Sequence, residues 1–336
     1  MYIQKTIPLF TDIFYNYCNY SVYFSVLRYF NFSLKEFFCD TVFHYDYAEN
    51  ANSLFKYLAN GDSVKGIPGI MDVLKVNRQW QEPVGDIVNY LKKRLDNGSL
   101  LIVLIDVHPS TIKWLRHFEY PDRGFEKVHG PHSLGICGYN EDNRTFTTID
   151  DGGEGAFQDV MSFDELSACH QSLLENCRHE GTSVLEFFSD QRNGNFASLS
   201  DAAYARKLVL LYKDHLQELY QNLELLKNMQ SDLISICEAK ELPTWDQYCI
   251  LYYLQEIYWK MNSRSYSFQQ LIPPKTELCF SLKSISEKWL ITKNIAHKDF
   301  IKGRVSTPCI QKIISSADEI YKMEKIFLDC LERIEL

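Results

Sequence analysis

The sequence predicts an α+β protein with a mixed first part and a helical second part. Up to about residue 190, short β-rich runs alternate with helical stretches and turns, and beyond that point the pattern is helical almost to the end. Apolar side chains occupy 46% of the 336 positions, which is enough to bury a core in each of two domains. We therefore expect one domain over residues 1–195 and an α-helical domain over residues 196–336.

The charge of the chain is divided unevenly between these two parts. Residues 1–195 contain 26 acidic against 17 basic side chains, whereas residues 196–336 contain 18 of each, so the net charge of −9 lies entirely in the first part. A surface that binds nucleic acid needs a basic stripe. This balance therefore argues against nucleic acid as the main ligand.

Neither a membrane span nor a secretory leader is expected. No apolar run approaches the roughly 20 residues of a spanning helix, and the start, MYIQKTIPLFTDIF, has no small-residue cleavage site after an apolar block. The ten cysteines form no CxxC pairs, which is typical of reduced thiols in a cytoplasmic protein. The run ACHQSLLENCRHE matches no standard zinc spacing, so no metal site is expected.

The first predicted helix follows a cysteine. In TDIFYNYCNYSVYFSVLRYF, apolar residues recur at helical spacing over residues 23–30. Cys18 precedes this helix, with Asn16 and Asn19 as possible caps. Because unpaired N–H groups at a helix N-terminus favour a thiolate, Cys18 is a candidate nucleophile; the alternative is a buried structural cysteine.

A second helix and a buried strand are predicted before a long loop. VGDIVNYLKKRLDNG has apolar residues at helical spacing with Gly98 as its C-cap, and LLIVLID, residues 100–106, suits a buried strand. Asp106 ends this strand and is expected to cap it or anchor the next loop; the alternative is that it binds a substrate. Residues 107–131 predict a long loop with a helical turn around residues 112–118, and such loops are often lids.

Two short apolar runs predict a β-hairpin bordered by polar residues. His132 opens the first run and Asp150 closes the second, with the turn near residues 140–143. The two residues then lie opposite each other or about one pair apart, so their side chains can meet. An imidazole held by a carboxylate is the base and orienting group of a nucleophilic triad; the alternative is a structural pair. Cys137, at an odd offset from His132, should point to the other face and join the core.

The second part predicts a helical bundle or cap. Four amphipathic stretches are joined by short connections, and the longest covers residues 203–241. This near-neutral part suits an acidic binding partner better than the first part, which carries the net charge of −9.

Four runs of this chain resemble those of a known family: YCNYSVYFSVLRYFNFSLKEFFC, LDNGSLLIVLID, HSLGICGYNEDNRTFTTIDD and SFDELSAC. They resemble the butirosin-biosynthesis acyltransferase family, and the third is similar to the His and Asp signature of the peptidase domains of bacteriocin-exporting transporters. The resemblance covers roughly the first 190 residues. It implies a papain-like cysteine protease fold, with N-terminal helices packed on an antiparallel sheet, followed by an α-helical C-terminal region. It makes Cys18 the nucleophile, His132 the base and Asp150 the orienting group.

The chain departs from the papain-like pattern around the oxyanion hole. Papain-like peptidases usually carry Gln six residues before the nucleophile and Gly after it, where this chain has Asp12 and Asn19. The backbone N–H of Cys18 is the expected oxyanion donor, with Asn16 or Asn19 as further candidates.

The resemblance implies a cysteine-dependent acyltransferase or amide synthetase. Its family moves an acyl group from a carrier-protein phosphopantetheine thioester to an amine in antibiotic biosynthesis, and the amide synthetase of closthioamide assembly is similar. The implied partners are an acyl or peptidyl carrier protein and a small-molecule amine, with no cofactor. Aminolysis of a thioester is downhill and needs no ATP, and the chain contains no G-x-x-x-x-G-K-[ST] loop. The alternatives are a cysteine peptidase or thioesterase that hydrolyses the same acyl-enzyme, and a papain-like binding module.

Overall fold

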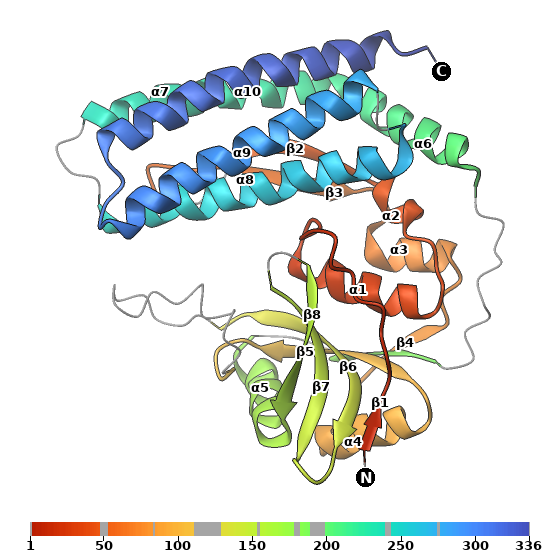
Figure 1. The fold of residues 1–336 in the computed structure, drawn as a ribbon. Coiled ribbons are helices and arrows are strands. Elements are labelled where there is room, and N and C mark those ends of the chain that lie inside the picture. The colour runs from red at the N-terminus through yellow and green to blue at the C-terminus, as the bar shows by residue number, and fades with distance from the viewer. Residues whose placement is uncertain are drawn as a thin grey trace. The chain divides into compact units, whose positions relative to one another are not determined.

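The computed structural model shows an α+β chain with an antiparallel sheet and a helical C-terminal region, as predicted (Figure 1). The chain divides into two compact units. Unit 1 contains Met1–Leu34 and Met71–Ser198, and unit 2 contains Lys35–Ile70 and Leu199–Leu336. The structure describes residues 2–47, 53–82, 85–110, 129–152, 155–177, 182–188, 199–238, 243–273 and 276–335, apart from the side chains of Cys18, Glu238, Thr244 and Trp245.

Unit 1 is built on a seven-stranded antiparallel sheet. The strand order is β4-β9-β5-β6-β7-β8, and β1 pairs with the far end of β6. The strands are β1 (Tyr2–Gln4), β4 (Arg78–Gln81), β5 (Leu100–Asp106), β6 (Pro131–Asn140), β7 (Thr145–Asp151), β8 (Ala156–Ser162) and β9 (Val184–Phe187). The helices of this unit are α1 (Cys18–Tyr29), α4 (Ile87–Asp96) and α5 (Phe163–Asn176).

A hydrophobic core in unit 1 lies between the sheet and helices α4 and α5. Ile87, Leu91 and Leu95 recur every four residues along α4, and all three are buried against β5 and β6. The carboxylate of Asp86 caps α4 by accepting from two first-turn N–H groups, and the hydroxyl of Ser162 caps α5 by accepting from the N–H of Glu165. The predicted second helix and the predicted buried strand are both confirmed.

Helix α1 begins at Cys18 itself. Its N-cap residue is Tyr17, and no side chain caps the helix, so the prediction that Asn16 or Asn19 does so is wrong. Asn16 instead takes a left-handed backbone conformation with φ of 54°, which asparagine tolerates better than most residues. This turn directs the chain into the helix immediately after Tyr17, so the asparagine shapes the backbone rather than capping it.

Unit 2 combines a β-hairpin with long helices (Figure 1). The hairpin packs against α7 and α8, while α9 contacts α8 and α10, and α10 contacts α7. The elements are α2 (Lys35–Phe38), β2 (Thr41–Tyr47), β3 (Tyr57–Ser63), α3 (Gly66–Val73), α6 (Asp201–Asp214), α7 (Leu216–Glu238), α8 (Thr244–Leu271), α9 (Glu277–Ile301) and α10 (Thr307–Arg333). Helix α3 spans the point between Ile70 and Met71 where the chain passes from unit 2 to unit 1.

Two features of unit 2 differ from the sequence expectation. Residues 35–70 belong to this unit, although the predicted boundary assigns them to the first domain, because their hairpin packs with the helices α7 and α8. The predicted boundary at residue 195 lies outside the described residues. The single helical stretch predicted over residues 203–241 is divided at His215, whose ring Nδ1 lies 2.9 Å from the carbonyl of Leu211.

A buried ion pair joins α8 to α10 in the core of unit 2. The guanidinium of Arg264 contacts the carboxylate of Glu324, and both side chains are 2% exposed. The Tyr45 hydroxyl donates to Glu324 Oε1 at 2.6 Å and accepts from Trp289 Nε1 at 3.0 Å. Four side chains from β2, α8, α9 and α10 thus form one buried polar cluster, in which Nε of Arg264 has no hydrogen-bond partner among the described residues.

Candidate functional site

His132 and Asp150 form a buried hydrogen-bonded pair on neighbouring strands of unit 1. The Nε2 atom of His132 lies 2.7 Å from Oδ1 of Asp150, and the side chains are 4% and 1% exposed. The same Oδ1 accepts from the backbone N–H of Asp151 at 2.8 Å. The carboxylate is thereby oriented toward the imidazole. The structure thus brings together the two residues that the hairpin pattern predicted would meet.

The register of β6 and β7 makes this a diagonal contact. Gly135 pairs with Ile149, so Asp150 lies opposite the residue two positions after His132. Diagonal neighbours on one face remain within reach of long side chains, and an imidazole spans this separation. His132 itself pairs with Ile105 of β5, which places it between two strands in the middle of the sheet.

The pairing assigns different roles to the two ring nitrogens of His132. Because a carboxylate accepts hydrogen bonds, Nε2 of His132 carries the proton and donates its N–H to Oδ1 of Asp150. In the neutral ring, Nδ1 then carries the lone pair. Any proton that His132 exchanges with a nucleophile must pass through Nδ1. This is the arrangement of a base held in one tautomer by an acidic residue.

Helix α1 packs against β6 and β7, the strands that carry the pair. Gly135 marks the contact, because a Cβ placed there would lie 3.1 Å from both Val22 Cγ1 and Ile149 Cβ. Val22 lies about one helical turn after Cys18, the first residue of α1. The side chain of Cys18 lies outside the described residues. A glycine within an apolar strand is the sequence signal that could have predicted this close approach.

The residues that flank Cys18 differ in what they can offer an oxyanion. Asn16 is 1% exposed, and Asn19 is partly buried, with an Oδ1 that has no hydrogen-bond partner among the described residues. The N–H of Tyr20 donates to the carbonyl of Tyr17 at 3.0 Å. The N–H groups of Cys18 and Asn19 are therefore the first-turn donors that an oxyanion beside the thiol would meet.

Asp106 anchors both ends of the segment that follows β5. Its carboxylate accepts from the N–H groups of His108 at 3.1 Å and Gly130 at 3.0 Å and from Ser172 Oγ at 2.6 Å, and Nδ1 of His129 lies 2.6 Å from Oδ2. Burial by itself raises the pKa of Asp106, but these four bonds outweigh that effect and hold the pKa below its usual range. With so many donors on it, the carboxylate fits a loop anchor better than an amine site. Sequence reasoning missed Ser172 and His129, because nothing in the pattern links them to Asp106.

The remaining predicted features of unit 1 are partly outside the described residues. The helical turn predicted around residues 112–118 lies outside the described residues. Cys137 lies in the core, as predicted, and burial raises its pKa to about 11. Within the described ranges, no group of three or more His, Cys, Asp or Glu side chains is placed to hold a metal ion. In the same part of the chain, none of the helices is both long enough and apolar enough to cross a membrane.

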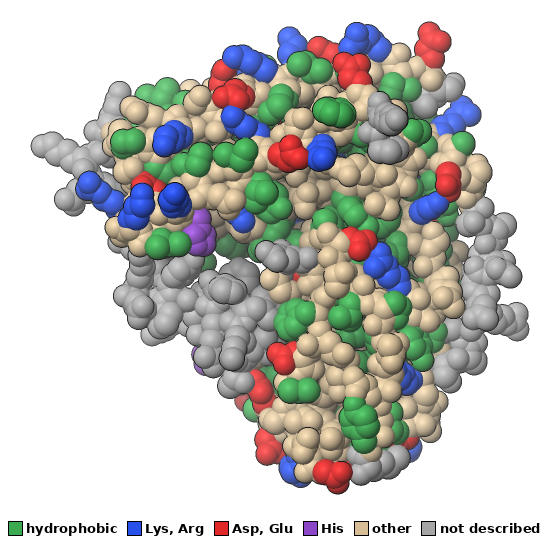
Figure 2. Space-filling model, in the orientation of Figure 1, with side chains coloured by type: hydrophobic (Ala, Val, Ile, Leu, Met, Phe, Trp, Pro, Cys, Tyr) green, Lys and Arg blue, Asp and Glu red, His purple; other side chains and the backbone are tan. Residues whose placement is uncertain are grey.

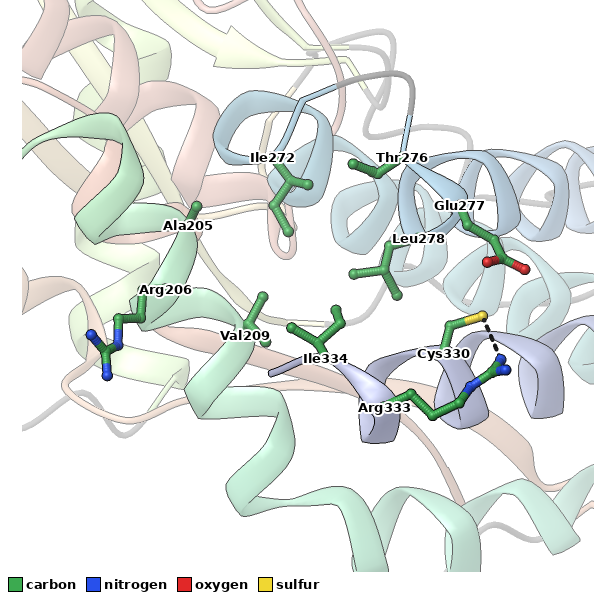
Figure 3. A pocket seen from close by; sticks show the side chains of 10 residues that line it. All are labelled: Ala205, Arg206, Val209, Ile272, Thr276, Glu277, Leu278, Cys330, Arg333 and Ile334. Atoms are coloured by element: carbon green, nitrogen blue, oxygen red, sulfur yellow. Dashed lines mark hydrogen bonds between the residues drawn. The ribbon is translucent and has the colours of Figure 1, made fainter. Parts of the chain in front are cut away.

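A cavity of about 620 Å³ lies in unit 2, between the start of α6, the start of α9 and the end of α10 (Figure 3). Val209, Ile272, Leu278 and Ile334 make its wall largely apolar. It contains none of the candidate site residues of unit 1.

None of the protein-family models matches the chain, and no curated protein matches it. The function must therefore be argued from the chain's own residues.

Proposed function

We propose that this protein is a papain-like, cysteine-dependent acyltransferase that forms an amide from a carrier-bound thioester and an amine. The buried His132–Asp150 pair carries the proposal. It supplies a base with a fixed tautomer, and α1, which starts at Cys18, packs on the same two strands. A thiol at the start of a helix meets the conditions that favour a thiolate.

The reaction proceeds in two exchanges on Cys18. His132 takes the thiol proton through Nδ1, and the thiolate attacks the carbonyl carbon of the thioester. The new bond to Cys18 forms as the bond to the carrier thiol breaks, and His132 returns the proton to that leaving thiol. An amine then attacks the acyl-enzyme, loses a proton to His132 and releases the Cys18 thiol. The first-turn N–H groups of α1 stabilise the oxyanion of each step.

The experiment is acylation by a small thioester, followed by intact-mass measurement. Wild type incubated with acetyl-pantetheine should gain one acetyl group, and addition of a primary amine should discharge it as the amide. Cys18→Ala should gain nothing, whereas Cys237→Ala, which removes a partly exposed cysteine in unit 2, should behave as wild type. Acylation of Cys18→Ala, or no acylation of wild type, would contradict the proposal.

The product distinguishes this activity from hydrolysis. A peptidase or thioesterase would use the same pair and the same cysteine, but its acyl-enzyme would release free acid at the same rate with or without amine. Amide formation that exceeds acid release when both amine and water are present favours the transferase. Acid alone, in the presence of every amine tested, would favour the hydrolase.

A further inference from the structure

A basic patch lies where α9 ends and the chain turns into α10. It consists of Lys298, Ile301, Lys302 and Arg304, all exposed, and Ile301 is 71% exposed. Because residues three and four apart share one helix face, the first three project together from α9. Figure 2 shows Lys and Arg side chains gathered with a histidine at this end of the long helices.

The three cations of this patch form no ion pair with any described residue. Asp299 is the only acidic residue between them, and its carboxylate is engaged elsewhere. Oδ2 of Asp299 accepts from Ser306 Oγ at 2.6 Å and Ser306 N at 2.7 Å, and these bonds hold the pKa of Asp299 below its usual value. Asp299 therefore keeps its negative charge, and the three cations leave this turn with a net charge of +2 in a chain whose net charge is −9.

The backbone beneath the patch is held in one conformation by several hydrogen bonds. Gly303, at φ of 108°, ends α9 with its N–H on the carbonyl of Phe300 at 2.8 Å. Val305 is buried, and its N–H donates to Gln247 Oε1 of α8 at 2.8 Å. Ser306 caps α10 through its bond to Cys309 N. The basic side chains thus project from an ordered connection, which lowers the conformational entropy lost when a partner binds.

We propose that the basic patch docks the acidic carrier protein that delivers the acyl group to Cys18, an inference that rests on the proposed function. A protein surface that presents carboxylates around an apolar spot would match three cations arranged about Ile301. Nucleic acid is disfavoured, because three cations are few and the whole chain is acidic. A single exposed isoleucine is too small an apolar surface to hold the chain on a lipid layer.

The test compares two acyl donors on two charge-reversed variants. The donors are an acetylated acyl carrier protein and acetyl-pantetheine, and the readout is the rate at which Cys18 gains the acetyl group. The patch variant is Lys298→Glu, Lys302→Glu and Arg304→Glu. The control variant makes the same change in net charge at three exposed lysines of unit 2 that already pair with carboxylates: Lys227→Glu, Lys283→Glu and Lys322→Glu.

The patch variant should accept acetyl from the carrier protein about tenfold more slowly or worse, while its rate with acetyl-pantetheine stays at the wild-type value. The control variant should match wild type with both donors. For wild type, added salt should slow acetylation of Cys18 by the carrier protein and leave acetylation by acetyl-pantetheine unchanged. Equal carrier rates in the patch and control variants would overturn the docking site. The docking site would also be overturned if the patch variant lost binding to anionic lipid vesicles but accepted acetyl from the carrier protein at the wild-type rate.

One further variant and one further measurement keep the docking site testable on its own. If charge reversal prevents folding, the glutamine triple variant of the same positions replaces it. If acetyl-pantetheine fails to acylate wild type, the proposed catalytic function fails. Titration of wild type and the patch variant with the carrier protein then decides docking alone, and equal affinities would overturn it.

Discussion

Val22 of α1 lies against Gly135 of β6, so closely that a methyl group at position 135 would meet Val22 Cγ1 at 3.1 Å. The helix that begins at Cys18 therefore rests on the strand that carries His132. A Cβ at this point would force the side chain of Val22 or Ile149 to give way by a few tenths of an ångström. The position of α1 on the sheet depends on this contact.

Gly135→Ala should destabilise unit 1 by about 1–3 kcal/mol, because the added methyl group overpacks the contact with Val22 and Ile149. Urea unfolding measures the loss. Gly130→Ala is the matched control, since a Cβ there meets nothing within 4 Å, and it should leave the free energy of unfolding almost unchanged. Equal effects of the two substitutions would mean that the close contact of α1 with β6 does not contribute to the free energy of unfolding.

Asp150→Asn should reduce the rate of Cys18 acylation on the order of 10³–10⁴-fold, because the amide no longer fixes the proton of His132 on Nε2. The rate is measured by intact mass with acetyl-pantetheine. Asp159→Asn changes an exposed carboxylate on the adjacent strand and should keep the wild-type rate. A similar rate in both variants would assign the His132–Asp150 pair a purely structural role.

Cys18 should react with iodoacetamide at pH 7 before Cys137 and Cys39. Burial raises the pKa of both latter thiols to about 11, so at pH 7 only about one molecule in 10⁴ carries either thiolate. Peptide mapping by mass spectrometry follows each site over time. His132→Gln should slow the labelling of Cys18 alone. Labelling of Cys137 first would contradict an activated Cys18.

Asp106 should make the stability of unit 1 depend on pH in the acidic range. Its folded pKa is depressed by its hydrogen bonds, so it stabilises the fold fully above its unfolded pKa of about 3.9. That contribution is lost as the pH falls through the folded pKa. The gap in unfolding free energy between wild type and Asp106→Asn should therefore be widest above about pH 5 and narrow below about pH 4. Urea unfolding across this range measures the gap, and a constant gap would refute the assignment.

Glu324→Gln should destabilise unit 2 by about 3–5 kcal/mol, because it leaves the buried guanidinium of Arg264 without a counter-charge. The double variant Arg264→Met, Glu324→Leu should lose less than the single variant, since it removes both charges together. Urea unfolding of the three proteins provides the comparison. A double variant that is less stable than Glu324→Gln would contradict this account.

The sequence predicted the local elements of unit 1 better than the composition of the units. The strand over residues 100–106 and the hairpin turn near residues 140–143 were found because apolar runs and turn residues mark them directly. The meeting of His132 with Asp150 followed from that turn. Residues 35–70 were assigned to the first domain, because periodicity does not say which helices a short strand packs against.

Around the candidate site, the misses have a common physical cause. Asparagine is a common N-cap residue, but Asn16 lies one position before the N-cap residue Tyr17 and takes a left-handed backbone conformation there. The partners of Asp106 are distant in the sequence: Ser172 is 66 residues away, and His129 and Gly130 are 23 and 24 residues away. Long-range polar contacts of this kind are set by the tertiary fold and leave no local pattern.

The insertion of residues 35–70 into unit 2 also affects the order in which the newly made chain can fold. Tyr45 and its partner Glu324 are 279 residues apart. At about 5–20 residues per second, the ribosome adds that length in roughly 15–55 seconds. Unit 1, complete once residue 198 has emerged, can fold during synthesis. The hairpin can pack once α7 and α8 have emerged, but the contact of Tyr45 with Glu324 must wait for α10.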